Sequence, residues 1–462
     1  MGRWADASAG SQRSRHGITR RAGSHRGNSS GHRKSYRWKV LPDADAQARL
    51  RHLASRQTGD YIARWRTELE TGVPSRLARS VGAHLLDVGY SPRSLAEWLK
   101  ERRTSSLYEL LEDAQGLMAA GHRTWTVFVP VISLPGEVLR SSDHFVDATK
   151  ADLWLKARSW TLEGLRVNGA LICRFTARDP WSAVQEARES LNRLRSRIAL
   201  ALPPNRVLAI GGWARVQGES HRFFLDEVSQ RVETPNLRAT PEALWMGARR
   251  DSAEQVDDAI ELASAVTSGS PAAAITGAWA AVEGLLLRPN ELGGQRAADR
   301  MAAIVTCAFG SAELWNVGSG LDLGVLGLSP GSPRAARAPA LEELLRTGIV
   351  PAVKHATDAA ALVRLTQLIA EPDALRRVHT YLSDSFRRLY NQRNLLMHSG
   401  SFNSCALRPT LRTVPELVGA GLDRILHAAR GDVIPMDLAA RAEFELEIYG
   451  ASGTRWLHDL LA

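Results

Sequence analysis

The stretch 390–398 of this chain contains an arginine and a histidine, Arg393 and His398, in a pattern suited to phosphate chemistry. A guanidinium makes bidentate contacts with a phosphate and offsets the charge that builds on it during displacement. An imidazole moves a proton to or from a 2′-hydroxyl or a leaving 5′-oxygen. The pair is therefore suited to cleaving RNA without a metal ion. Nearby polar side chains are candidates for contacting the phosphate or the flanking backbone: Asn394, Arg387 and Arg388.

The helix that carries this pair is predicted from Leu375 to Met397, because apolar residues recur there every three or four positions. Arg393 falls on this apolar stripe, and an unpaired buried guanidinium is expensive. We therefore expect either a carboxylate partner, or a cleft or subunit interface where an anion binds. The stripe consists of Leu375, Val378, Leu382, Phe386 and Leu389, and it resumes at Leu396 and Met397.

Helical geometry decides whether Arg393 and His398 act together. Five residues on a regular helix rotate the side-chain direction by about 140°, so the two side chains point apart. They converge if the helix unravels at Ser399-Gly400, which is a helix stop signal. They also converge if two copies of the chain meet across a symmetric interface.

A second apolar helix, residues 278–287, contains a single carboxylate, Glu283. Glu283 lies four residues after Trp279 and four before Leu287, on or beside the apolar stripe. A buried carboxylate at this position is a natural partner for Arg393 and would fix the orientation of its guanidinium.

These two segments resemble the HEPN-domain ribonucleases. Residues 393–398 are similar to the Rx4–6H motif of that family, and 278–287 is similar to the first helix of its Apea-like branch, where a glutamate interrupts an apolar helix. The resemblance covers about residues 252–430. It implies that Arg393 and His398 are the catalytic pair, that Asn394 is an auxiliary polar residue and that Glu283 supports the arginine.

The resemblance also implies a helical bundle that forms a homodimer and cleaves RNA without a metal or cofactor. Family members act as toxins or phage-defence effectors, so a phage-derived or antitoxin-like regulator is an expected partner. Ser399-Gly400 follows His398 where one toxin subgroup has a tyrosine that is AMPylated. Regulation by that modification is therefore not expected.

Three other interpretations stay open. A HEPN-like scaffold would use the arginine to bind RNA or a nucleotide without turnover. Alternatively, Arg393 pairs with Glu283 only for packing and His398 is a helix-end histidine. The third is a DNA-binding regulator that uses residues 75–105, where a Gly-containing turn joins two helices, together with the basic N-terminal tail.

The predicted fold class is an α+β N-terminal region followed by an all-α HEPN-like helical bundle. The expected segments are a disordered basic tail (1–39), a helical segment (40–120), an α+β sensor or regulatory domain (121–245), the bundle (246–430) and C-terminal helices (431–462).

Within the first half, strands are predicted at 126–132, 169–175 and 207–216, which are rich in Val, Ile and aromatic residues. Ser91-Pro92 and Asp179-Pro180 are each expected to cap and open a helix. Residues 318–339 are predicted to form a loop. Its Gly327-Leu328-Ser329-Pro330-Gly331 lacks the strand and helix that a serine-hydrolase elbow requires.

The net charge of +10 belongs almost entirely to the tail. Residues 1–39 contain ten Lys and Arg residues and one acid, so the tail carries +9 and the rest of the chain +1. A basic arm adds sequence-independent phosphate affinity. The charge of the whole chain is therefore no argument that its folded body binds nucleic acid.

Other function classes lack their motifs. The chain has no GxxxxGK, HExxH or CxxC pattern, and its three cysteines, Cys173, Cys307 and Cys405, are widely scattered. No apolar run reaches the roughly 18 residues that a membrane span requires, and no secretory signal follows the start. We expect a cytoplasmic protein with no metal site, cofactor or membrane partner.

Overall fold

The structure is a computed structural model. It describes residues 65–66, 74–135, 140–162, 164–203, 207–225, 232–238, 251–268, 270–291, 293–399, 404, 406–449 and 456–461. The predicted disordered tail, residues 1–39, lies outside the described residues, as does Cys405.

The first described helices are α2 (Pro74–Val88), α3 (Pro92–Glu101) and α4 (Leu107–Ala119). Their buried faces form one small core that includes Leu85 and Leu111. The predicted Ser91-Pro92 start of α3 is confirmed, because the Ser91 side chain accepts a hydrogen bond from the Ser94 amide. Two arginines in and next to α3 contact other side chains of the protein. Arg102 pairs with Asp113, and the guanidinium of Arg93 lies over the Trp181 ring. These contacts favour packed helices over a DNA-reading pair.

An antiparallel sheet follows, in the order β2-β3-β1-β5-β6, with β4 pairing β1. The strands are β1 (Arg123–Ser133), β2 (Phe145–Asp147), β3 (Gly169–Ala177), β4 (Ala209–Ile210), β5 (Trp213–Val216) and β6 (Arg222–Phe224). The predicted strand 207–216 is two short strands, because Gly211-Gly212 separates them. Gly211 also packs so closely on Pro130 that a Cβ atom would lie 2.6 Å from its Cγ.

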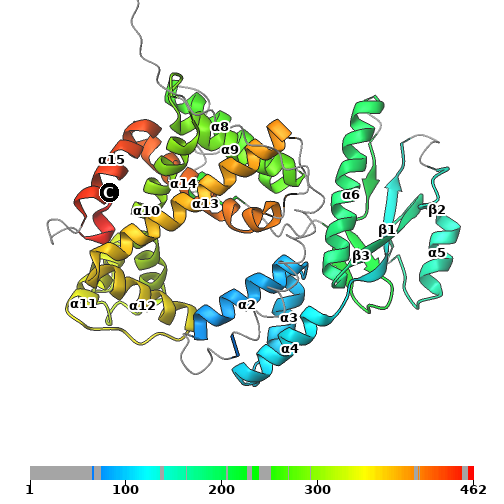
Figure 1. Ribbon diagram of the computed structural model, residues 1–462, viewed down its shortest axis with the longest axis horizontal. Helices are drawn as coiled ribbons and strands as arrows, with labels where there is room; N and C mark the ends of the chain where they lie inside the picture. The colour runs from blue at the N-terminus through cyan, green and yellow to red at the C-terminus, as the bar shows by residue number, and fades with distance from the viewer. Residues whose placement is uncertain are drawn as a thin grey trace, which may run out of the picture. The chain divides into compact units, whose positions relative to one another are not determined.

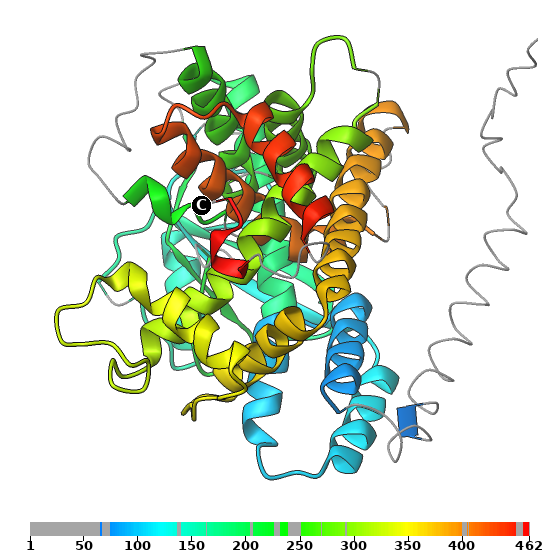
Figure 2. The same cartoon turned by 90° about the vertical axis from the view of Figure 1, so that its left-hand side faces the viewer.

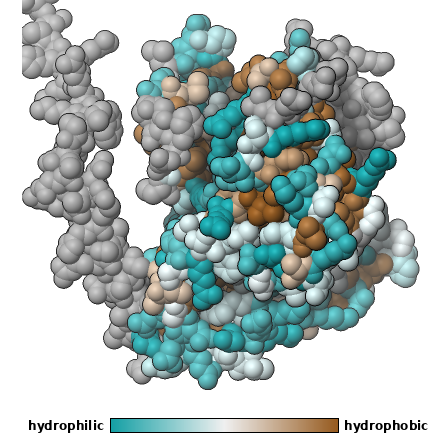
Figure 3. Space-filling model, turned by 90° about the vertical axis from the view of Figure 1, so that its right-hand side faces the viewer, coloured by the Kyte–Doolittle hydropathy of each residue, from teal (hydrophilic) through white to brown (hydrophobic). Residues whose placement is uncertain are grey.

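Helices cover both faces of this sheet (Figure 1). The long helix α6 (Pro180–Ala201) packs on the side where Val127 and Val129 point, and α5 (Ala148–Lys156) packs on the side of Phe128. Alternate residues of β1 therefore enter opposite cores, as the period of a strand requires. Figure 3 shows hydrophobic residues gathered near the middle of one face, and the α+β region exposes several large apolar side chains: Leu153, Leu200 and Phe224.

Asp179 joins two helix starts. Its carboxylate caps α6 by accepting from the Ser182 amide at 2.8 Å, as the sequence predicts. It also accepts from the Ser91 amide at 2.7 Å and from the Ser91 hydroxyl at 3.0 Å. One buried carboxylate thus fixes the N-termini of α3 and α6 against each other.

The rest of the described chain is helical and shares one core. Its helices are α8 (Asp251–Ser268), α9 (Pro271–Leu286), α10 (Gln295–Gly320), α11 (Arg337–Arg346), α12 (Ala356–Ala370), α13 (Pro372–Ser399), α14 (Leu407–Arg430) and α15 (Pro435–Ile448), with short 3-10 turns η1 (Pro235–Arg238), η2 (Arg334–Ala336) and η3 (Leu457–Asp459). Helix α10 contacts most of the others, and α13 packs along it (Figures 1 and 2).

The segment between α10 and α11 is a loop with one 3-10 turn, much as predicted, although α11 begins at Arg337. The Gly327–Gly331 stretch is neither preceded by a strand nor followed by a helix, so no nucleophile elbow forms there. Glu342 of α11, which is fully buried, accepts from the backbone amides of Leu457 and His458. The helices after residue 430 are therefore tied into the same bundle.

The described chain thus consists of an α+β N-terminal region with a small antiparallel sheet and a helical C-terminal region. None of the described helices combines the length and apolar character needed to cross a bilayer.

Arg300 holds the end of α9 against α10. Its guanidinium donates to the Leu286 carbonyl at 2.8 Å and to Glu291 Oε1 at 2.7 Å. The hydrogen bond from Arg300, followed by one from the Arg288 amide, lowers the pKa of Glu291 from 4.5 to about 2. Since a depressed carboxylate pKa stabilises the fold above the unfolded value, this contribution is present above pH 4.5 and is lost as the pH falls toward 2.

We predict that Arg300→Gln lowers the melting temperature most at neutral pH and progressively less below about pH 4.5. Arg296→Gln is the control, because Arg296 reaches the same Glu291 from an exposed position at 3.5 Å and exposed pairs contribute little. Thermal denaturation at a series of pH values measures both. Equal effects of the two variants would contradict the role assigned to Arg300.

Candidate functional site

The expected partners Glu283 and Arg393 meet in the structure. Glu283 lies on α9 and Arg393 on α13, and the Arg393 Nη2 atom is 3.7 Å from Glu283 Oε2. Both side chains are partly open to solvent, with 32% and 27% of their surfaces exposed. The Arg393 side chain is therefore partly buried, and it is paired with a carboxylate.

A hydrogen bond also holds Glu283 in place. The indole of Trp279, which is fully buried, donates from Nε1 to Glu283 Oε2 at 2.8 Å. One carboxylate oxygen thus faces both the indole N–H and the guanidinium. If the carboxylate turned away from Arg393, the buried indole N–H would lose its acceptor, which costs free energy.

Aromatic packing fixes the distance between α9 and α13 below this pair. The rings of Trp279 and Tyr390 lie 5.0 Å apart at a tilt of 47°. Gly294, at the start of α10, packs against both rings, so that a Cβ atom there would lie 2.5 Å from Trp279 and 2.6 Å from Tyr390. A glycine is required at this position because there is no room for a side chain.

The predicted apolar stripe of α13 is largely confirmed. Leu375, Leu382, Phe386, Leu389 and Leu396 are buried, and Val378 is partly buried. Met397 is an exception at 57% exposure, because it lies about 100° around the helix from buried Leu396. Sequence reasoning missed Gln392, which is buried, and whose Oε1 atom has no hydrogen-bond partner among the described residues.

His398 is exposed in the last turn of α13. The helix continues to Ser399, so it does not unravel in time to bring His398 back toward Arg393. Gly400, the second residue of the predicted stop, lies outside the described residues. On a continuous helix the two side chains diverge by about 140°, and a single copy of α13 does not bring them together.

The remaining candidates occupy different surroundings. Asn394 is partly buried, and its Oδ1 accepts from Arg393 Nη1 at 3.1 Å, which adds a second constraint on the guanidinium. Arg387 is exposed and pairs with Asp299 of α10 at 2.9 Å. Arg388 is exposed beside it. The structure thus groups Glu283, Arg393 and Asn394, and leaves the two upstream arginines separate.

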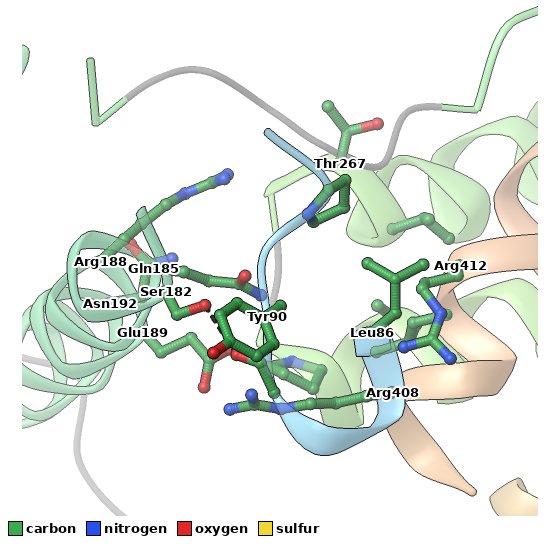
Figure 4. A pocket seen from close by; sticks show the side chains of 16 residues that line it. Leu86, Tyr90, Ser182, Gln185, Arg188, Glu189, Asn192, Thr267, Arg408 and Arg412 are labelled. Carbon is green, nitrogen blue, oxygen red and sulfur yellow. Dashed lines mark hydrogen bonds between the residues drawn. The ribbon is translucent and has the colours of Figure 1, made fainter. Parts of the chain in front are cut away.

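A cavity of about 320 Å³ lies elsewhere, among α2, α6, α9 and α14. Figure 4 shows Arg188 and Gln185 of α6 on one side of it, Arg408 and Arg412 of α14 on the other, and Tyr90 between them. These residues come from segments far apart in the sequence and form no local motif. Sequence reasoning therefore had no signal by which to find this cavity.

The charges around this cavity are largely matched. Arg408 pairs with Glu186, and Arg412 pairs with Asp87. The pKa of Glu189, which also lines the cavity, is raised by burial and then by the charge of Glu186. The arginines thus connect α14 to α6 and α2, and they do not form an open anion site.

Within the part of the chain that the structure describes, no three His, Cys, Asp or Glu side chains gather in a way that could hold a metal ion. The two described cysteines, Cys173 and Cys307, are thiols and form no disulfide, and Cys307 Sγ contacts the Ala442 carbonyl at 3.5 Å. Burial raises the pKa of the Cys173 thiol, which disfavours the reactive thiolate.

Comparison of the chain with protein families, with curated proteins and with solved structures finds no match in any of the three.

We predict that Glu283→Ala lowers the free energy of unfolding by about 1 to 3 kcal/mol, because it leaves the buried Trp279 indole N–H unpaired. Glu283→Gln keeps an acceptor oxygen for the indole while removing the charge that faces Arg393, so its loss should be smaller. Urea denaturation of both variants measures the difference. Equal losses would mean that the ion pair, and not the indole hydrogen bond, holds Glu283 in place.

Proposed function

We propose that this protein is a metal-independent endoribonuclease of the HEPN type, with Arg393 and His398 as its catalytic pair. The observation that supports this most is the state of Arg393. Its guanidinium is fixed by Glu283 and Asn394, yet 27% of its side chain remains exposed on a helix that otherwise buries this face. A preorganised, partly desolvated arginine is what phosphate recognition needs.

In the proposed reaction the 2′-oxygen of a ribose attacks the adjacent phosphorus, and the bond from phosphorus to the 5′-oxygen breaks. The neutral imidazole of His398 accepts the 2′-hydroxyl proton and, once protonated, donates it to the leaving 5′-oxygen. Arg393 contacts the non-bridging oxygens as their charge increases. The products are a 2′,3′-cyclic phosphate and a 5′-hydroxyl.

The proposed site is built from two copies of the chain. Arg393 and His398 point apart on the continuous helix α13. A symmetric dimer in which the two α13 helices approach each other would place the histidine of one copy beside the arginine of the other. The exposure of His398 and of Met397 is consistent with a partner surface at this end of the helix.

The biological role proposed with this activity is that of a toxin or phage-defence effector whose α+β region senses a trigger. A phage-derived or antitoxin-like regulator would act through that region. This part of the proposal rests on the resemblance to HEPN proteins alone.

A second candidate function is a non-catalytic scaffold that binds RNA or a nucleotide. The divergence of Arg393 and His398 within one copy favours it, because the arginine alone can bind a phosphate without cleaving its ester. The two candidates differ in one measurable property, which is cleavage that depends on His398.

We expect the purified protein to cleave single-stranded or structured RNA in EDTA and to leave cyclic phosphate ends. Arg393→Ala and His398→Ala should each lower the cleavage rate by about a hundredfold or more, because each removes a group that acts in the transition state. Arg376→Ala is the matched control, since Arg376 is an exposed arginine of the same helix that pairs with Asp373. Gel analysis of end-labelled RNA gives the rates.

Undiminished cleavage by both active-site variants would overturn the assignment. RNA binding by the wild type without cleavage, under every activating condition tested, would favour the scaffold.

The two-copy arrangement predicts complementation. Arg393→Ala and His398→Ala proteins that are each inactive should regain activity when they are mixed and allowed to exchange subunits. A heterodimer then has one intact composite site, so an equal mixture should reach about a quarter of wild-type activity. Mixing either variant with itself is the control. Absence of recovery in a mixture shown to contain heterodimers would exclude a site shared in this way.

A further inference from the structure

The junction of α14 and α15 contains a cavity of about 370 Å³ with a strongly basic lining. Four of its lining residues are basic, and none of the lining residues is acidic. The basic residues are Arg424, His427, Arg430 and Arg441, and the others include Val433, Leu438 and Leu461. This cavity is separate from Arg393 and from the cavity in Figure 4.

Two of these arginines have partners outside the cavity lining. Arg430 donates to the backbone carbonyl and the side chain of Asn236. Arg441 donates to Glu445 at 2.9 Å, and the other oxygen of Glu445 accepts from the Leu461 amide at 2.7 Å. Asp423, whose charge also acts on Arg424, accepts from Asn236. Glu445 and Asp423 are therefore already engaged.

Arg424 has no such partner. Its side chain is partly buried, and its Nε atom is buried without a hydrogen bond to any described residue. No ion pair joins it to a carboxylate in the described part of the chain. The pKa of Arg424 is lowered, first by burial and then by the charge of Arg441, although Glu445, Cys307 and Asp423 act in the opposite direction.

The same excess of positive charge acts on His427. Burial lowers its pKa, and the charges of Arg424 and Arg430 lower it further. For both groups burial is the largest cause of the lowered pKa, and neighbouring positive charge is the next. A desolvated guanidinium beside like charges costs free energy in the absence of a counter-ion.

We propose that this cavity is a binding site for a phosphate group, held by Arg424 and Arg441 with His427 and Arg430 at its edge. Arginine suits phosphate because its planar fork donates two parallel hydrogen bonds to the phosphate oxygens. The phosphate can belong to a free anion, a nucleotide or the backbone of a bound RNA. The site is independent of the proposed cleavage chemistry, because none of its residues belongs to the Arg393 group.

The test compares wild type with Arg424→Gln in thermal denaturation, in sodium phosphate and in sodium chloride of equal ionic strength. Phosphate should raise the wild-type melting temperature in a concentration-dependent way, since a ligand that binds the native state stabilises it. Without phosphate, Arg424→Gln should be at least as stable as wild type, because the substitution removes an unneutralised charge. Its response to phosphate should be at least about tenfold weaker in apparent affinity.

Arg376→Gln is the control for loss of a positive charge at an exposed position, and it should keep the full phosphate response. If Arg424→Gln does not fold, Arg441→Gln takes its place in the same phosphate comparison. Adenosine 5′-monophosphate and a short 2′-O-methyl RNA that cannot be cleaved identify the source, since the natural ligand should stabilise at the lowest concentration.

The proposal is overturned if phosphate, nucleotide and RNA all fail to stabilise wild type more than chloride does. It is also overturned if Arg424→Gln keeps the wild-type response. A variant that folds but is clearly less stable than wild type in chloride would show that the protein itself already neutralises Arg424, and this too would overturn it.

Discussion

The carboxylate of Glu283 is the contact on which the Arg393 region depends. It accepts from the buried indole of Trp279 on the same helix, α9, and forms an ion pair with Arg393 of α13. The packing of Trp279 on Tyr390, with Gly294 beneath both rings, keeps those helices at the distance this contact needs. Arg300 then holds the end of α9 against α10. Together these contacts orient one arginine.

That orientation has a consequence for any chemistry at this site. Arg393 is constrained before a ligand arrives, which is the condition under which an arginine stabilises developing charge most effectively. His398 is exposed and belongs to the same unbroken helix, so its direction is set by helical geometry and not by the arginine. A site that uses both residues therefore requires a second copy of the chain, and a site that uses only Arg393 requires none.

Positive charge has three different roles in this molecule. The N-terminal tail accounts for nearly all of the net charge of +10. Arg393, Arg408 and Arg412 each face a carboxylate, so their charges are compensated within the fold. Arg424 faces other cations without such a partner in the described residues, and that imbalance is what suggests an anionic ligand. The local balance of charge, and not its total, distinguishes a structural arginine from a ligand-binding one.

The sequence by itself determined the local structure and one long-range contact. The caps at Ser91 and Asp179, the strands β1 and β3 and the stripe of α13 follow from residue type and periodicity, because these patterns act over a few residues. Arg393 and Glu283 were paired because each interrupts an apolar face and therefore needs the other. Only the tertiary structure decided that α13 stays helical past His398, that Gln392 is buried and that Arg424 lies among cations. Those features depend on which distant segments pack together, and no local pattern encodes that.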